Sequence, residues 1–383
     1  MIDYLRIHVL WATESKLRAH SSQLISTHFD GIGMERDGVA YRIPVRFRSE
    51  SWSVSGPPLD VDLSAATHNA VVLLHDDFMH EEAALWGRYV ANLQADMAAR
   101  GNADVYIPFG SPTRDPPLQT DIEGHIQYAR RDIWQTALTT PSSRDTRLLL
   151  HLVFTLRQHL RSALGSIGRD EPLFVSHAKS DGDSTARAIV DYVNNSGHDV
   201  PLETFYDAME LSPGDDFKAK FDETIGRGTL LAIVSDVYDS RPWCVYELTS
   251  AKRARRPIVL ADVGRGRISR TYPYGANLPK VRLSLDRPLE EWIEPLLVET
   301  LSEGLRCDLF EAQAQRLLDR AGILDALVLP RPPELFDIID RAAIAFTIVY
   351  PDPPLARIES DLLRKCLNLV APGAKLVTLS ELG

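Results

Sequence analysis

Cysteine and long hydrophobic runs are both scarce in this sequence of 383 residues. The three cysteines, Cys244, Cys307 and Cys366, are far apart and odd in number, so they form neither a disulfide framework nor a CxxC zinc motif. The longest apolar stretch, residues 148–156, is interrupted by His151 and is far shorter than the roughly 20 residues that cross a bilayer. The N-terminal segment lacks the basic start, apolar core and cleavage site of a signal peptide. We expect a soluble cytoplasmic protein with reduced thiols, no metal and no membrane contact.

Positive charge is outnumbered by negative charge. Lys and Arg total 42 against 53 Asp and Glu, which gives a formal net charge of −11. Such a field repels the phosphates of nucleic acid, so we expect no direct DNA or RNA partner. The sequence also lacks the glycine-rich P-loop, HExxH and GxSxG motifs. ATPase, zinc-hydrolase and α/β-hydrolase chemistry therefore have no support.

The composition that remains is that of a globular chain, with 44% hydrophobic and 25% charged residues. The length predicts two or three domains. Short apolar or β-branched runs alternate with helical patterns, which predicts an α/β fold with largely parallel sheets. We divide the chain into residues 1–117, an N-terminal α/β domain; 118–168, a helical connector; 169–306, a second α/β domain; and 307–383, a helix with a small C-terminal βαβ extension.

The pattern predicts these elements in the first two parts: strands at 6–11, 43–47, 70–74 and 105–109, a helix at 82–100, and two helices within 125–164 separated by a polar break at 139–144. The second α/β domain has the pattern of a flavodoxin-like, doubly wound, five-stranded parallel sheet. Its predicted strands are 173–176, 204–207, 229–235, 257–262 and 280–285, and its predicted helices are 184–196, 216–225, 242–254 and 288–303. The last part has a helix at 309–318, strands at 344–350 and 375–379, and a helix at 358–369. This βαβ unit is too small to fold alone, so we expect it to dock on another domain.

The most informative segment is AIVSDVYDSRPWCVYEL, residues 232–248. A buried strand leads into a polar loop, and a helix begins near Ser240, which is suited to the N-cap, and Pro242, which is tolerated in the first turn. Trp243 and Glu247 are four residues apart and share one helix face. That face follows the carboxyl end of a strand, where open α/β sheets bind ligands. A solvated glutamate beside a core tryptophan is the alternative.

Three motifs in order resemble the TIR (Toll/interleukin-1 receptor) domain over roughly residues 171–305. LFVSHAKSD, residues 173–181, resembles the first strand and its exit, and TFYDAMELSPGDDF, residues 204–217, resembles the second strand and the BB loop. SDVYDSRPWCVYEL carries the WCxxE signature at Trp243, Cys244 and Glu247. The family contains non-catalytic adaptors and enzymes that cleave NAD⁺ at the nicotinamide–ribose bond, and prokaryotic members deplete NAD⁺ during phage infection.

The resemblance implies that Glu247 is the catalytic residue and that NAD⁺ is a substrate, with no resident cofactor. Nicotinamide leaves as a neutral molecule and needs no general acid, so one carboxylate that stabilises the oxocarbenium charge suffices. The candidate substrate-binding residues are Ser176, His177, Lys179, Phe205, Ser235, Tyr238 and Trp243. Each has a plain alternative: a polar loop, a strand terminator or an aromatic core.

The resemblance also implies a homo-oligomer through TIR domains, with an activating ligand or partner protein. The loop Leu211, Ser212, Pro213, Gly214 and Asp215 would contact a neighbouring copy, although the same residues read as an ordinary turn. The alternative function is an adaptor that acts only by homotypic binding.

The N-terminal domain could be a distant TIR-like repeat, since residues 70–78 can be aligned with residues 230–238. Trp86 can be set against Trp243 of the signature, but Val90 then stands where the carboxylate of Glu247 would be. We therefore expect no catalysis in the N-terminal domain. The basic run at Lys252, Arg253, Arg255 and Arg256 ends a helix, and the helix dipole accounts for it.

Overall fold

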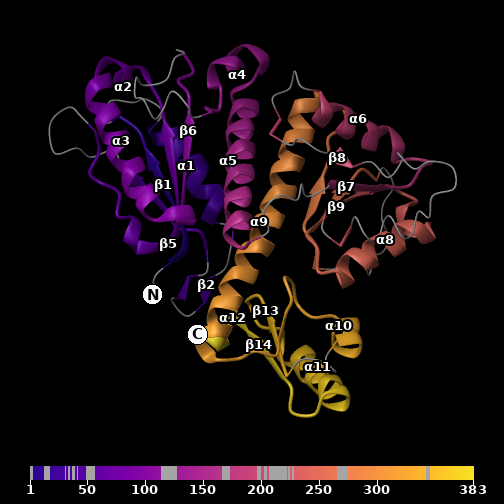
Figure 1. Cartoon of the computed structure of the whole chain (residues 1–383). Helices are drawn as coiled ribbons and strands as arrows, with labels where there is room; N and C mark the ends of the chain where they lie inside the picture. The colour runs from indigo at the N-terminus through magenta and orange to yellow at the C-terminus, as the bar shows by residue number, and fades with distance from the viewer. Residues whose placement is uncertain are drawn as a thin grey trace. The chain divides into compact units, whose positions relative to one another are not determined.

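The computed structural model describes residues 3–12, 18–30, 32, 35–36, 39–40, 42–48, 57–113, 127–165, 173–195, 200–201, 205–206, 222, 225–226, 228–264, 275, 277–341 and 346–383. The chain forms two compact units (Figure 1). The first comprises Met1–Gly33 and Tyr41–Ser166, and the second comprises Met34–Ala40 and Ile167–Gly383. The α/β class with parallel sheets that the sequence predicts is confirmed. The division into four parts stays a prediction.

The first unit is built on a parallel sheet in the order β4-β1-β5-β6. Its strands are β1 (Asp3–Leu10), β4 (Val45–Arg48), β5 (Ala66–Leu74) and β6 (Asp104–Phe109), and its helices are α1 (Arg18–Asp30), α2 (Asp77–Glu81), α3 (Ala83–Ala99), α4 (Arg131–Ala137) and α5 (Pro141–Ala163). Residues 70–74 of the inner strand β5 are an apolar run that is buried throughout, as expected for a parallel strand covered on both faces.

The predicted break between the two connector helices is wrong in its extent. Helix α5 begins at Pro141, inside the segment that we expected to be non-helical. The hydroxyl of Thr140 accepts a hydrogen bond from the backbone N–H of Ser143 at 3.1 Å. Thr140 is therefore an N-cap followed by proline in the first turn, which starts a helix instead of interrupting one.

The second unit contains a five-stranded parallel sheet in the order β11-β10-β9-β7-β8. Its strands are β7 (Leu173–His177), β8 (Phe205–Tyr206), β9 (Thr229–Val234), β10 (Ile258–Asp262) and β11 (Lys280–Arg282), with α6 (Asp183–Asn194) and α8 (Pro242–Arg253) between them. The predicted loop at 211–215 lies outside the described residues, as does most of the predicted helix at 216–225. A short antiparallel pair, β2 (Glu35–Arg36) and β3 (Val39–Ala40), also belongs to this unit.

Helix α9 (Leu289–Ala321) is one helix of 33 residues, where the sequence predicts two. The buried side chains of Leu301, Leu305 and Leu309 recur every four residues across the expected gap, so the apolar stripe continues without a break. A single buried glycine, Gly304, does not stop it. The helix ends at Gly322, whose φ of 66° is the left-handed conformation typical of a helix C-terminus.

The C-terminal extension is a three-stranded parallel sheet in the order β12-β13-β14. It consists of β12 (Ala326–Val328), β13 (Thr347–Tyr350) and β14 (Lys375–Thr378), with helices α10 (Leu335–Arg341), α11 (Arg357–Val370) and α12 (Leu379–Leu382). It has one strand, β12, more than the predicted βαβ unit, because three residues after the Gly322 turn are too short a run to stand out in sequence.

The basic run at the end of α8 holds this extension. Lys252, whose side chain is 1% exposed, pairs with Glu334. The guanidinium of Arg255 donates to the carbonyl oxygen of Val328 at 3.1 Å, and that of Arg331 donates to the carbonyl oxygen of Arg256 at 3.1 Å. The helix dipole alone therefore does not explain the positive charges of Lys252 and Arg255, since both side chains also bind the C-terminal extension.

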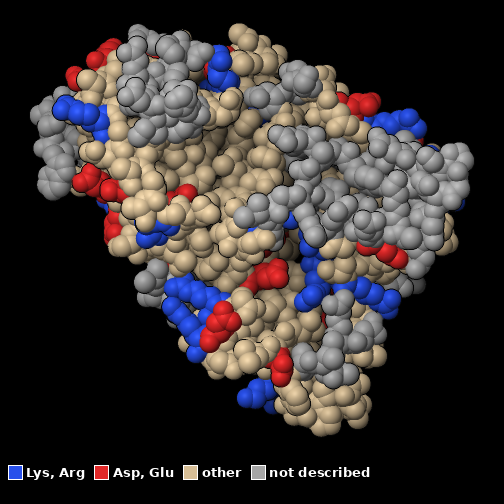
Figure 2. All heavy atoms as spheres, viewed as in Figure 1, with Lys and Arg blue, Asp and Glu red and all other residues tan. Residues whose placement is uncertain are grey.

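Charges of both signs are interspersed on the face shown in Figure 2, among the residues drawn in colour. Within the described part of the chain, no helix is both long enough and apolar enough to span a bilayer.

Candidate functional site

Three polar side chains from separate elements meet beside the carboxyl ends of β7 and β9. Ser176 lies near the end of β7, Tyr238 lies in the short turn after β9, and Glu247 lies in the middle of α8. All three are buried, with 1% exposure for Ser176, none for Tyr238 and 6% for Glu247. The fold therefore brings together residues that are far apart in sequence at the edge of the sheet where α/β proteins bind ligands.

Hydrogen bonds join the three side chains in a line. The hydroxyl of Ser176 donates to Oε2 of Glu247 at 2.5 Å, and the oxygens of Ser176 and Tyr238 are 2.7 Å apart. When Glu247 is ionised, the single proton of Ser176 goes to the carboxylate, and Tyr238 is then the donor to Ser176. The line of donors thus runs from the phenol through the serine to the glutamate.

Burial makes Glu247 an unusual carboxyl group. Desolvation raises its pKa from 4.5 to about 7, and the hydrogen bond from Ser176 opposes that rise. A carboxyl group with a pKa near neutrality exists in both protonation states at physiological pH. This is the behaviour of many acids and bases in active sites, although buried structural carboxyls show it too.

The helix that carries Glu247 begins at Pro242, the first residue of the predicted range, but Ser240 is not its N-cap. The N-cap position is Arg241, whose side chain makes no capping hydrogen bond, and Pro242 follows in the first turn. The predicted N-cap, Ser240, instead donates its hydroxyl to the carbonyl oxygen of Val237 at 2.7 Å. That bond lies within a turn of 3-10 helix ahead of α8. The hydroxyl of Ser240 is therefore bonded to this turn and does not cap α8.

Ser235 is hydrogen bonded to Asp181, a residue that the sequence did not single out as a candidate. Its hydroxyl donates to Oδ1 of Asp181 at 2.6 Å, and Oδ2 of Asp181 accepts the backbone N–H of Val237 at 3.3 Å. Asp181 thus ties the loop after β7 to the loop after β9. Its place in the polar exit of the first strand is the only sequence signal that could have identified it.

His177 and Lys179 are not brought to the Ser176–Tyr238–Glu247 cluster. Successive strand residues point to opposite faces, so His177 lies on the other side of β7 from Ser176. Its Nδ1 is 3.3 Å from the carbonyl oxygen of Val175, and its Nε2 is 3.6 Å from Oδ1 of Asp183. Lys179 is exposed in the loop beyond the strand. Roles for these two residues in substrate binding stay predictions.

The predicted aromatic residues have different surroundings. Trp243 is 53% exposed and packs edge-on against Tyr246, with ring centroids 5.7 Å apart. The ring of Tyr238 is fully buried in the core, so in this structure it is a hydrogen-bond donor and not an open stacking surface. Phe205 lies in β8, and its side chain is outside the described part of the structure, as are all five residues of the loop at 211–215.

The described residues contain neither a reactive thiol at Cys244 nor a cluster of metal ligands. Burial, with the negative charge of Glu247, raises the pKa of Cys244 to about 12, so its thiol stays protonated. No group of three or more His, Cys, Asp or Glu residues in the described part of the chain could hold a metal ion. The chemically distinctive group at this site is therefore the carboxyl of Glu247.

The N-terminal sheet has the strand order of the first four strands of the second unit, since β4-β1-β5-β6 corresponds to β8-β7-β9-β10. The pairs Val9–Val72 and Ser176–Ala232 occupy equivalent registers when residues 70–78 are aligned with 230–238. Val9 and Phe78 then stand at the positions of Ser176 and Tyr238, and Val90 stands at the position of Glu247 when Trp86 is set against Trp243. Apolar residues thus replace the whole polar line. Common ancestry of the two units stays a prediction, because parallel α/β sheets share this order widely.

Residues 173–294 match the family model described as the TIR domain. The chain contains a TIR domain. A comparison with curated proteins gives no match. Among solved structures, the C-terminal domain of glucosamine-fructose-6-phosphate aminotransferase from Francisella tularensis is similar over 79% of this chain and 82% of that chain, at 9% identity. Its TM-score is 0.19, which is too low to inform the fold.

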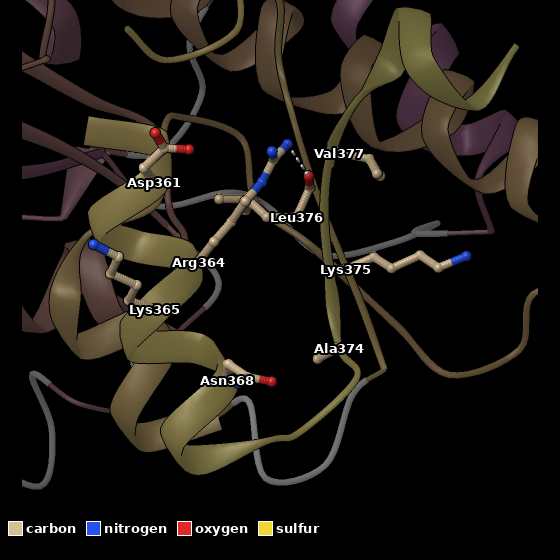
Figure 3. A pocket seen from close by; sticks show the side chains of 8 residues that line it. All are labelled: Asp361, Arg364, Lys365, Asn368, Ala374, Lys375, Leu376 and Val377. Carbon is tan, nitrogen blue, oxygen red and sulfur yellow. Dashed lines mark hydrogen bonds between the residues drawn. The ribbon is translucent and has the colours of Figure 1, made fainter. Parts of the chain in front are cut away.

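A hollow on the extension beyond the TIR domain has mixed charge. It lies between α11 and β14 and is lined by Asp361, Arg364, Lys365, Asn368 and residues 374–377 (Figure 3). The guanidinium of Arg364 points to the carbonyl oxygen of Leu376, 3.4 Å away. Since a carboxylate accompanies the cations and one cation is already engaged, this lining does not select a class of ligand.

Proposed function

We propose that the TIR domain is an NAD⁺ glycohydrolase in which Glu247 is the catalytic residue. The observation that supports this most is the buried carboxyl of Glu247, held by Ser176 at the carboxyl edge of the sheet and carrying a pKa near 7. A carboxylate in that position can accept hydrogen bonds from the ribose hydroxyls. It can also stabilise the positive charge that develops as the glycosidic bond breaks.

The reaction needs no other catalytic group from the chain. The bond between C1′ of the ribose and the pyridinium nitrogen breaks, and its electron pair goes to nicotinamide, which leaves as a neutral molecule. Water then bonds to C1′ and releases a proton, giving ADP-ribose; attack by the adenine ring instead gives cyclic ADP-ribose. Trp243, exposed on the same helix four residues before Glu247, is the side chain best placed to pack against the substrate.

The test is release of nicotinamide from NAD⁺ by the purified, concentrated full-length chain, followed by chromatography. We expect Glu247→Gln to abolish release and Glu359→Gln, an exposed carboxylate on α11, to leave it unchanged. Equal release by wild type and Glu247→Gln would contradict the proposal.

A non-catalytic adaptor that acts by homotypic TIR binding is the second candidate. The observation that favours it is the 6% exposure of Glu247, because a buried carboxyl satisfied by Ser176 can be purely structural. Self-association without nicotinamide release under any condition would identify the adaptor.

For the enzyme, we further propose a role as an effector in prokaryotic antiphage defence, in which NAD⁺ depletion follows activation. Cells that express the wild-type chain should then lose NAD⁺ and restrict phage growth, whereas cells with Glu247→Gln should do neither.

A further inference from the structure

A buried arginine of the first unit lacks a hydrogen-bond partner for one of its terminal nitrogens. Arg131, the first residue of α4, is 8% exposed. Its Nη1 atom is buried and makes no hydrogen bond to any described residue. A guanidinium donor that is removed from water and left without an acceptor is costly, so an acceptor is expected at this position.

Arg131 lies at the carboxyl edge of the N-terminal sheet. Ala129 bridges to Phe109, the last residue of β6, and the backbone N–H of Gly110 donates to the carbonyl oxygen of Ala129 at 2.9 Å. The guanidinium is close enough to His75, which follows β5, that its charge contributes to lowering the pKa of that histidine to about 3; burial is the larger cause. This edge of a parallel sheet is where ligands bind.

Two carboxylates attract Arg131 without hydrogen bonding to its Nη1 atom. Oδ1 of Asp76 accepts the backbone N–H of Met79 at 3.0 Å, and Oδ2 of Asp145 is 2.7 Å from Nε2 of His20. Desolvation outweighs the attraction of Asp145 and Asp76 and lowers the pKa of Arg131 to about 10. Neither carboxylate therefore serves as the hydrogen-bond acceptor of the buried Nη1 atom.

We propose that Arg131 binds the phosphate or carboxylate group of a small molecule beyond the carboxyl ends of β5 and β6. The planar fork of a guanidinium matches both oxyanions and can bind them through two parallel hydrogen bonds. The ring of Tyr128 packs against His75 with centroids 5.2 Å apart at the same edge of the sheet. Because Arg131 is buried, the ligand is a small molecule and not a nucleic-acid backbone. This site does not depend on NAD⁺ cleavage by the TIR domain.

Isothermal titration of the full-length chain with inorganic phosphate, AMP and acetate tests the site. We expect saturable binding of at least one probe. The affinity of Arg131→Gln for that probe should be lower than that of wild type by a factor of about ten or more, because a hydrogen bond to a charged group is lost. Arg130→Gln is the matched control: Arg130 is the next residue, and its charge is already paired with Asp132 at 2.6 Å. Its affinity should equal that of wild type. Binding of acetate alone identifies a carboxylate ligand, and binding of phosphate or AMP alone identifies a phosphate ligand.

Two results would overturn the proposal: no saturable binding of any probe, or equal affinity of wild type and Arg131→Gln. The second would place the bound probe elsewhere, for example on the TIR domain. If Arg131→Gln does not fold, Arg131→Lys keeps the charge and removes the fork, so its affinity must fall as well. Hydrogen exchange of residues 127–137 in the wild-type chain must also slow when the probe is added, and unchanged exchange counts against the site.

Discussion

The hydroxyl of Ser176 lies 2.5 Å from Oε2 of Glu247, although the two residues are 71 positions apart in the chain. Burial raises the pKa of Glu247, and the hydrogen bond from Ser176 acts against that rise. Ser176 therefore controls how much of this carboxyl group is ionised near neutral pH.

If the ionised form of Glu247 is the active one, nicotinamide release should increase with pH around a midpoint near the pKa of about 7. Ser176→Ala removes the bond that favours the carboxylate, so we expect its midpoint to rise by about one pH unit. Measuring kcat against pH gives both midpoints. Ser180→Ala, an exposed serine in the following loop, is the control, and a midpoint shared by all three proteins would contradict the role of Ser176.

The same pKa predicts how stability depends on pH. Between the ordinary value of 4.5 and the folded value of about 7, the unfolded chain loses a proton that the folded chain retains. The contribution of Glu247 to the free energy of unfolding therefore falls as pH rises through this window and is constant above it. Glu247→Gln lacks this loss, so relative to wild type it should gain about 3 kcal/mol between pH 4 and pH 8, because each pKa unit is worth about 1.4 kcal/mol. Urea denaturation at the two pH values checks this, and an equal difference at both would refute it.

Activity should require self-association through the TIR domain. Binding two copies costs translational freedom, about 4 kcal/mol or more, so the rate per protomer should fall on dilution. Gly214→Trp, at the tip of the predicted BB loop, should lower activity while the monomer stays folded. Asn368→Trp, on the exposed surface of α11, provides a bulky control. Specific activity beside mass photometry decides the matter: a constant rate at concentrations where only monomers are seen would argue against assembly.

The first compact unit should not cleave NAD⁺. Val9 and Phe78 offer no side-chain oxygen at the positions that correspond to Ser176 and Tyr238, and Val90 offers none at the position of Glu247 when Trp86 is set against Trp243. A fragment of residues 1–166 incubated with NAD⁺ should release no nicotinamide above the buffer blank. Release by that fragment would mean that the active unit has been assigned wrongly.

Glu334→Ala should destabilise the second unit. It leaves the ammonium of Lys252, whose side chain is 1% exposed, without its carboxylate. Removing one member of a buried pair costs about 3–5 kcal/mol, and the partial exposure of Glu334 reduces the expected loss to about 2–3 kcal/mol. Asp361→Ala, which removes an exposed carboxylate 4.0 Å from Arg357, should cost less than about 1 kcal/mol. Denaturant midpoints of the two variants make the comparison, and similar losses would show that the pair is not important.

The sequence was sufficient for the class of the fold, and it offered Ser176, Tyr238 and Glu247 as separate candidates without predicting that they meet. Apolar strands in alternation with helices predicted the parallel sheets, and the spacing of Trp243 and Glu247 placed both on one helix. Ser176 was a candidate because it ends the first strand, but nothing in the sequence specified its bond to Glu247. That contact depends on β7 and β9 being neighbours, which is a property of the whole sheet.

The remaining errors have local causes. A polar stretch around Thr140 looked like a break because capping and interruption use the same residues. The sequence predicts two helices in place of α9 because Gly304 and the charged residues Glu303, Arg306 and Asp308 lie near its middle. Asp181 was overlooked because a solvated loop aspartate and one that bridges two loops look identical in a single sequence.

Helix α8 makes two contacts with different parts of the second unit, one from its middle and one near its C-terminal end. Glu247 accepts a hydrogen bond from Ser176, and Lys252, five residues further along, pairs with Glu334, which directly precedes α10 of the C-terminal extension. At a rise of about 1.5 Å per residue these two contacts are about 7.5 Å apart along one stiff rod. A displacement of the C-terminal extension that moves Lys252 along the helix axis would therefore also move Glu247 relative to Ser176. The C-terminal extension is therefore coupled through one rigid helix to the carboxyl group whose pKa lies near 7.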